Sequence, residues 1–488
     1  MSSRHVDRGI PRPAIRTMAA VPPRLTIAGG ADTVPGTGEA VSFDMAVRAH
    51  VPGTVRAGIE ELAGRAVVTA RSVSGHHRGA LAGTDGATIA AAAQLASDLR
   101  LPLVIVLASS GSDVNDGIDA LHGWGRAAAA VVCCSGVVPV LAAVVGPAIS
   151  GPALLLGLAD VTAMTPNAFA FLSGPDAVEG FTGVRVSLHD LGGTAMHATA
   201  SGVCALAASD PDQAMDLLGA TLAYLPDHTD AAPPLFPTDD DPERPTPELR
   251  DALPSAASAS YDVRDLVRTV VDDAEILELR PGWAPQLVTA LASIGGVPIG
   301  VVASQPRALA GTLDIAGSQK GARFVRFCDT FNLPLLTLVD TPGFLPGKDL
   351  EWRGMIRHGA ELAFAYAEAT VPRVCLVVRK AYGGAYIVMD SKGIGNDVCL
   401  AWPSAEIAVM GATGAVQILH RDADRSERRD LEDRYRADLL TPWVASERGF
   451  VDAVIDPTDT RITLARTFAV LHSHRELLAG RKHEAGPL

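Results

Sequence analysis

The chain has 488 residues, of which 48% are hydrophobic and 20% are charged, so its length and composition indicate a globular protein with two well-buried domains. Its net charge of −14 argues against a nucleic-acid-binding surface and gives no general attraction for acidic ligands. The six cysteines show neither metal-ligand nor disulfide spacing, so we expect no metal site and a reduced, cytoplasmic protein.

The order of composition along the chain predicts its domains. Residues 1–40 combine Pro, Gly and Arg and lack the apolar core of a signal peptide, so we expect a flexible N-terminal arm. Residues 41–235 are expected to form the first α/β domain. Residues 236–260 are expected to be a linker, because Pro, Asp, Ser and Ala dominate from about residue 226 onwards. The second α/β domain is expected over residues 261–488.

One segment resembles a membrane span, since no charged residue occurs between Ala127 and Ala159. Glycines and prolines interrupt this segment repeatedly, which predicts the end of one helix, a strand and the start of a second helix. A parallel strand that is buried on both faces also reads as a continuous apolar run. We therefore expect no membrane association. Near the C-terminus, the charged residues 421–436 predict a solvated helix, and the tail from Pro457 is also predicted to be helical.

The two halves of the chain repeat one pattern at a nearly constant offset. LPLVIVLASSG at 101–111 corresponds to LPLLTLVDTPG at 333–343. VPVLAAVVGPAISGPALL and VPRVCLVVRKAYGGAYIV form a second matching pair, in which equivalent glycines stand at Gly151 and Gly384. The repeat predicts two copies of one α/β unit, in which a buried strand ends in a turn of small residues.

No familiar side-chain motif accounts for catalysis. Ser150 lies in A-I-S-G-P, which lacks the first glycine of a nucleophile elbow, and GFLPGK at 343–348 does not have the spacing of a P-loop. His358 lies in a predicted helix, where a single histidine more often packs or forms a hydrogen bond than catalyses. These residues leave the backbone of the two turns as the best candidate for chemistry.

The two turns are Ser150-Gly151-Pro152 and Gly383-Gly384-Ala385. A strand followed by small residues and a helix leaves N–H groups free at the helix start, where the dipole favours negative charge. Such donors stabilise an oxyanion that develops during a reaction. The glycines could instead serve only close packing. Two matched turns favour a functional role, because a group transfer between two carbonyl-type partners needs two oxyanion holes.

Three segments of the second half resemble a known family. They are KGARFVRFCDTFNLPLLTLVDTPGFLPG at 320–347, IRHGAELAFAYAEATVPRVCLVVRKAYGGAYIVMDSK at 356–392 and AWPSAEIAVMGATGAVQIL at 401–419. These segments resemble the β subunit of biotin-dependent acyl-CoA carboxylases, the carboxyltransferase of the propionyl-CoA and acetyl-CoA carboxylase group. Residues 261–279 resemble the opening of its second domain. The resemblance is weaker over 101–210 and poor before residue 100.

The resemblance implies an α/β fold of two tandem crotonase-like domains, the ββα-spiral domains of the ClpP/crotonase type. It implies a hexamer, formed with itself or a related β subunit, whose active sites lie between the first domain of one subunit and the second of another. The implied partner is an α subunit with biotin carboxylase and biotin carrier functions, so the cofactor is biotin on a partner carrier protein. The implied substrate is an acyl-CoA.

The resemblance also assigns roles to the turns. The thioester oxygen of the acyl-CoA enolate would bind at Ser150 and Gly151, and the ureido oxygen of biotin at Gly384 and Ala385, beside Gly383. Biotin itself would accept the α-proton, which fits the lack of a compelling side-chain base. The neighbouring candidates for substrate binding are Pro152, Tyr382, Tyr386 and Ile387.

The first half departs from the family pattern. The family's GPCAGGA reads GPAISGPA here, so Ser150 and Gly151 keep their N–H groups while Pro152 has none. The family's DSGGARIQEG reads ASSGSDVNDG, which places Asp113 at an arginine-like position. Ile387 replaces the Asp of propionyl-preferring members and favours acetyl-CoA or a broader acyl range. An active carboxyltransferase is therefore the leading hypothesis. The alternatives are a degenerate, non-catalytic or half-site subunit that docks biotin carrier protein or an intact β subunit, and a carboxyacyl-CoA decarboxylase.

Overall fold

The computed structural model describes residues 53–72, 77–256, 259–478, 480 and 486–487. All of them belong to one compact unit, Ser42–Leu488. The arm expected over residues 1–40 lies outside the described residues, as does the start of the predicted first domain.

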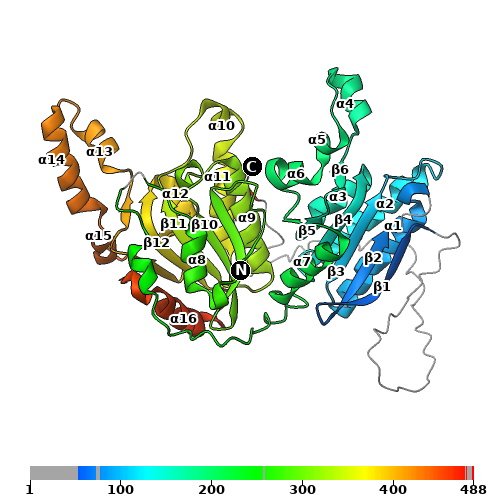
Figure 1. The fold of residues 1–488 in the computed structure, drawn as a ribbon, viewed down its shortest axis with the longest axis horizontal. Helices are drawn as coiled ribbons and strands as arrows, with labels where there is room; N and C mark the ends of the chain where they lie inside the picture. Colours follow the sequence, from blue (N-terminus) through cyan, green and yellow to red (C-terminus); the bar gives the residue numbers. More distant parts are fainter. Residues whose placement is uncertain (1–52, 73–76, 257–258, 479, 481–485, 488) are drawn as a thin grey trace, which may run out of the picture. The chain divides into compact units, whose positions relative to one another are not determined.

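The first half is built on a seven-stranded sheet with the order β1-β2-β3-β4-β5-β7, in which β6 also pairs with β4 (Figure 1). The pair β1 and β2 is antiparallel, and the other pairs are parallel. The strands are β1 Val55–Leu62, β2 Arg65–Ser72, β3 Leu103–Ser109, β4 Val140–Ile149, β5 Val161–Met164, β6 Phe169–Phe171 and β7 Leu206–Ala207.

The second half repeats this arrangement in an eight-stranded sheet with the order β15-β13-β12-β11-β10-β9-β8, in which β14 pairs with β12. Only the pairs that involve β9 are antiparallel among the described strands of this sheet. The strands are β8 Leu277–Glu278, β9 Leu287–Ile294, β10 Val297–Ser304, β11 Leu335–Thr341, β12 Arg373–Tyr382, β13 Val398–Ala401, β14 Glu406–Ala408 and β15 Ala453–Val454.

Helices connect the parallel strands in both halves. In the first half they are α1 Gly83–Leu99, α2 Ile118–Cys134, α3 Gly151–Leu158, α4 Pro175–Thr182, α5 Leu188–Gly192, α6 Thr194–Met196 and α7 Pro211–Ala223. In the second half they are α8 Val263–Val270, α9 Ile315–Thr330, α10 Lys348–Trp352, α11 Met355–Glu368, α12 Gly383–Val388, α13 Ala412–Leu419, α14 Arg425–Tyr435, α15 Pro442–Glu447 and α16 Thr460–Leu471.

The duplication extends to single backbone contacts. Leu81 forms an isolated parallel bridge with Ser112, and Leu313 forms the same bridge with Phe344 at the equivalent place in the second copy. Gly79 and Gly311, which are also equivalent in the repeat, have φ angles of 72° and 75°. The structure thus confirms two copies of one α/β unit.

Three apolar clusters explain why the strands read as continuous apolar runs. One cluster lies within the first half and another within the second, while the third contains residues of both, including Val104, Leu141, Leu287 and Val339. The central strands are therefore covered on both faces, and period-two alternation disappears. Five of the six cysteines are buried in this way, and Cys133 is exposed.

Further segments singled out in the sequence can be located in the structure. The apolar segment from Ala127 to Ala159 contains the end of α2, all of β4 and all of α3, as predicted. No helix in the described part of the chain is long and apolar enough to cross a membrane. The charged helix α14 has no buried residue and projects with α13 from the second half (Figure 1). Among the described residues of 236–260, regular structure is confined to a 3₁₀ turn, Pro247–Asp251.

Candidate active site

The turn at residues 383–385, called here the second turn, joins β12 to α12. Gly383 has φ 61°, a conformation that favours glycine, and a Cβ atom there would come within 3.1 Å of the Val409 carbonyl oxygen. Gly384 and Ala385 belong to the first turn of α12, where N–H groups have no carbonyl partner one turn earlier. We find no hydrogen bond from either N–H to described residues outside α12. The second turn therefore offers two backbone donors.

A largely apolar pocket of about 500 Å³ opens beside the second turn. Gly383, Gly384 and Ile387 contribute to its wall, and the Ile387 side chain is half exposed, at 47%. The wall is completed by Tyr386, Ile407, Ala408, Val409, Tyr435, Leu439, Val444, Ala445, Arg448 and Phe450. An apolar wall with a few polar groups at one side is typical of small-molecule sites.

The two tyrosines of the second turn differ in their placement. The Tyr382 hydroxyl donates a hydrogen bond to the Glu406 carboxylate, and burial together with this carboxylate raises the pKa of Tyr382. Tyr386 is 7% exposed, and burial raises its pKa as well. Both hydroxyls therefore stay protonated at neutral pH. Only Tyr386 lines the pocket, and Tyr382 supports the turn from its contact with the neighbouring strand β14.

The turn at residues 150–152, called here the first turn, joins β4 to α3 and departs from our expectation. The Ser150 N–H donates a 2.9 Å hydrogen bond to the Phe171 carbonyl oxygen, so it is not free for a ligand. Our prediction that Ser150 offers its N–H was therefore wrong, because β6 pairs with β4 closely enough to accept it. Pro152 is buried and has no N–H. Gly151 remains as the backbone donor of this turn.

Ser150 has an unusual conformation, with φ 61° and ψ −130°. Its φ equals that of Gly383, so a serine occupies a backbone conformation that glycine occupies in the second copy. Strain of this kind costs about 1–3 kcal/mol and concentrates at functional sites. Ser150 is exposed, and its hydroxyl has no hydrogen-bond partner among the described residues.

Each turn lies against an aromatic ring that our sequence reasoning missed. A Cβ atom on Gly151 would lie 2.8 Å from Cδ1 of Trp124, which belongs to α2. A Cβ atom on Gly384 would lie 3.6 Å from Cε2 of Phe344, an ordinary contact. These contacts could hardly be predicted from the sequence, because each ring belongs to a segment that is remote in sequence from the turn it touches.

Other sequence candidates lie outside the turns. The His358 ring contacts Glu361 at 2.8 Å and Gln319 at 3.1 Å, and this hydrogen-bonded helical histidine lines neither turn. The Asp113 carboxylate accepts hydrogen bonds from the backbone and side chain of Asn115, so part of its capacity is used within its own loop. We find no group of three or more His, Cys, Asp or Glu side chains arranged for a metal ion among the described residues.

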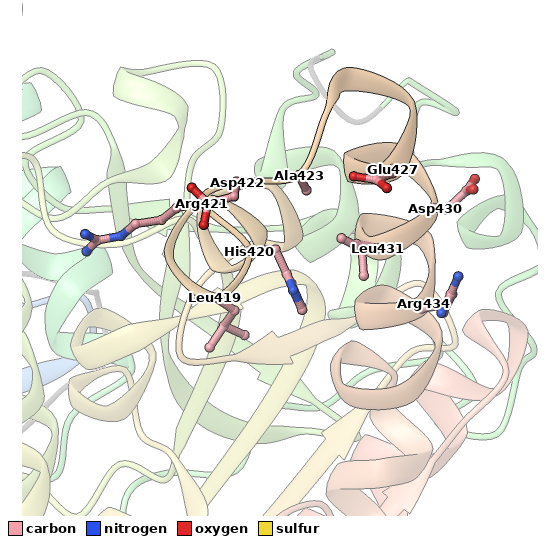
Figure 2. A pocket seen from close by; sticks show the side chains of 9 residues that line it. All are labelled: Leu419, His420, Arg421, Asp422, Ala423, Glu427, Asp430, Leu431 and Arg434. Atoms are coloured by element: carbon pink, nitrogen blue, oxygen red, sulfur yellow. The ribbon is translucent and has the colours of Figure 1, made fainter.

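Figure 2 shows a different depression, on the α13–α14 hairpin. Its volume is about 580 Å³, and its wall is formed by residues 419–423 and by Glu427, Asp430, Leu431 and Arg434 of α14. Side chains of both charge signs surround it, and none of the predicted site residues belongs to it. This depression therefore lacks the largely apolar wall of the pocket beside the second turn.

Two tandem crotonase-like units with equivalent strand–turn–helix sites define a class of acyl-group enzymes. The family model of the carboxyl transferase domain matches residues 39–485, so the chain belongs to this family of enzymes. This finding confirms the resemblance and the fold class that the sequence predicted.

Relatives with established names agree with this assignment. The chain is 43% identical to the propionyl-CoA carboxylase carboxyltransferase subunit of Haloferax mediterranei, over 80% of this chain and 78% of that protein. It is 39% identical to the methylmalonyl-CoA decarboxylase subunit alpha of Veillonella parvula, over 84% and 80% respectively. The structure of the transcarboxylase 12S hexamer with methylmalonyl-CoA bound matches 92% of this chain and 88% of its own, with a TM-score of 0.88 and 39% identity.

Proposed function

We propose that this chain is the carboxyltransferase subunit of a biotin-dependent acyl-CoA carboxylase. It transfers the carboxyl group of carboxybiotin to the α-carbon of an acyl-CoA. The proposal is supported by the second turn, where Gly384 lines an apolar pocket of about 500 Å³ and the N–H groups of Gly384 and the buried Ala385 stand in the first turn of α12. Carboxybiotin would be delivered on the carrier domain of an α subunit.

Each turn stabilises the negative charge that develops on a different oxygen during transfer. The N–C bond of carboxybiotin breaks, a C–C bond forms at the α-carbon, and the α-proton moves to the ureido group of biotin. Negative charge therefore builds on the ureido oxygen and on the thioester oxygen. Gly384 and Ala385 would donate to the ureido oxygen, and the first turn would donate to the thioester oxygen. A preorganised donor of this kind contributes on the order of 3 kcal/mol.

The first turn needs a second donor, because Pro152 and the engaged Ser150 N–H leave only Gly151. We assign this role to the Ser150 hydroxyl, which is exposed and free of partners among the described residues. A hydroxyl donor can rotate toward the thioester oxygen, whereas an amide N–H is fixed by the backbone.

The acyl group is the least specified part of the substrate. Ile387 presents an apolar side chain at the pocket wall, which suits an apolar rather than a polar neighbour. A hydrophobic wall discriminates by only about 1–3 kcal/mol per methylene. We therefore propose an acyl range broader than propionyl-CoA alone. A hexamer, the assembly named for the 12S transcarboxylase, would bring the two turns of different subunits together.

A carboxylation assay tests this function. The chain is combined with a biotinylated α subunit, ATP and bicarbonate, and acyl-CoAs of increasing length are supplied. We expect carboxylated product with at least one acyl-CoA and binding of that acyl-CoA in calorimetry. Absence of both turnover and CoA binding for every acyl-CoA would reject the proposal in favour of a non-catalytic subunit.

A further inference from the structure

A second pocket, called here the cationic pocket, lies where the two halves of the chain meet. Its volume is about 400 Å³, and its wall contains Arg280, Lys320, Arg323 and Arg326 from the second half. The other residues of the wall are Trp283, Gln319, Ala322 and Glu361 of the second half and Leu156, Gly157, Ala159 and residues 201–203 of the first half. Neither turn of the candidate active site contributes to this wall. The whole chain has a net charge of −14, whereas this pocket is lined by four cationic side chains.

Two of the three arginines in this wall have no carboxylate partner among the described residues. Arg323 donates to the Ala159 carbonyl oxygen at 3.0 Å and lies 3.4 Å from the Asp160 carboxylate. Lys320 donates to the carbonyl oxygens of Arg280, Trp283 and Ala284. The carboxylate in the wall, Glu361, bonds His358 instead of an arginine. Arg280 and Arg326 therefore have no carboxylate partner among the described residues.

The guanidinium of Arg326 has the least satisfied polar atom in this wall. Its Nε is buried without a hydrogen-bond partner among the described residues, and the group lies over the Phe364 ring, 5.5 Å from the centroid. Arg280 uses Nε on the Gly202 carbonyl oxygen at 2.7 Å, and its terminal nitrogens bond no acceptor in the described part of the chain. Burial and the neighbouring Arg323 lower the pKa of Arg280 to about 10. A cation that is withdrawn from water needs a compensating charge.

We propose that the cationic pocket binds a phosphate-class dianion, held by the guanidinium groups of Arg280 and Arg326. Two uncompensated guanidiniums match two negative charges, and the planar fork of each pairs with two phosphate oxygens. The dianion is either inorganic, as in pyrophosphate, or the diphosphate group of coenzyme A. The site is separate from both turns and does not depend on the proposed carboxyl transfer.

Calorimetry with inorganic pyrophosphate tests the site. We expect wild-type chain to bind with a Kd below about 1 mM. Arg326→Gln removes one charged fork and should weaken binding at least about tenfold, whereas Arg326→Lys keeps the charge and should weaken it less. The control is Arg268→Gln on α8, a half-exposed arginine that pairs with Asp265. It should bind as wild type does.

The folded state of each variant is checked by its melting temperature and oligomer size, and Arg326→Lys keeps the test valid if Arg326→Gln is unstable. A competition with coenzyme A then separates the two sources. If coenzyme A displaces pyrophosphate and loses affinity in Arg326→Lys, its diphosphate group is the ligand. If it does not compete, an inorganic or other phosphate is the ligand. No pyrophosphate binding at about 10 mM, or equal binding by wild type and both Arg326 variants, would overturn the proposal.

Discussion

The first and second turns occupy equivalent positions in two copies of one fold, yet they present different chemistry. The second turn has a glycine at φ 61° and two N–H donors beside an apolar pocket. The first turn has a serine at the same φ, an N–H engaged by Phe171, a proline and one remaining N–H. The strand–turn–helix frame has thus been kept, while the groups that face a ligand have changed.

This comparison shows that a duplicated site is preserved as a backbone path rather than as a set of donors. Ser150 has the same φ as Gly383 despite its side chain, because β4, β6 and α3 fix the path of the chain. In the function proposed above, this change moves one donor function from an amide to the Ser150 hydroxyl. The predictions below test whether the two turns differ in this way.

The largest effect should come from removing a donor of the second turn. Gly384→Pro removes an N–H at a position near the helix start, and we expect carboxylation to fall about 10²–10³-fold. Gly384→Ala is the matched control, since its Cβ would make only an ordinary 3.6 Å contact with Phe344. Its turnover should stay near that of wild type. Steady-state kinetics with the α subunit measure both, and equal activity of the two variants would remove Gly384 from the oxyanion site.

The equivalent alanine in the first turn should behave differently. Gly151→Ala places Cβ 2.8 Å from Trp124, so we expect overpacking that lowers the free energy of unfolding by about 1–3 kcal/mol. Adding Trp124→Leu should recover much of this loss, which a double-mutant cycle in denaturant measures. If Gly151→Ala is as stable as Gly384→Ala, the two turns are packed alike and the contrast fails.

A third contrast concerns α1 and α9, the helices that connect β2 to β3 and β10 to β11. Thr88 in α1 is the first-copy equivalent of Lys320 in α9, and its hydroxyl donates to the Thr84 carbonyl oxygen. Burial, with the nearby Arg280 and Arg264, lowers the pKa of Lys320 to about 7, while Glu278 opposes this shift. An unfolded lysine stays protonated to about pH 10.4, so above pH 7 the unfolded state binds more protons.

The free energy of unfolding should therefore rise with pH above 7, by at most about 1.4 kcal/mol per pH unit from this group. In Lys320→Met, the free energy of unfolding should no longer show this rise with pH, whether or not the substitution changes the stability at pH 7. Denaturant unfolding at pH 7, 8 and 9 gives the comparison. Parallel pH profiles for wild type and Lys320→Met would show that Lys320 remains protonated in the fold.

The smallest effects are expected at Ser150. Ser150→Ala removes the hydroxyl and keeps the strained φ, so carboxylation should fall about tenfold at unchanged stability. Ser150→Gly should also lose activity but gain about 1 kcal/mol of stability, because glycine adopts φ 61° without strain. Kinetics and unfolding of the two variants separate the two properties. Full activity in Ser150→Ala would exclude the hydroxyl as a donor.

The sequence predicted the features that depend on local pattern. The apolar runs and their small-residue ends located β4, α3, β12 and α12, and the repeat located both turns. The engaged N–H of Ser150 could not be predicted, because it depends on β6, a short strand with no sequence signal of its own. Trp124 and the cationic pocket were missed for a related reason, since they arise from contacts between distant segments.

The central claim is that the two turns together support transfer of a carboxyl group between an acyl-CoA and biotin. The most direct measurement supplies the purified chain with methylmalonyl-CoA labelled in its free carboxyl group and with excess free biotin, without any partner protein. We predict label on biotin and unlabelled propionyl-CoA, in equal amounts and only when both substrates are present. Release of labelled CO2 at the same rate with and without biotin, or no label on biotin, would contradict the account.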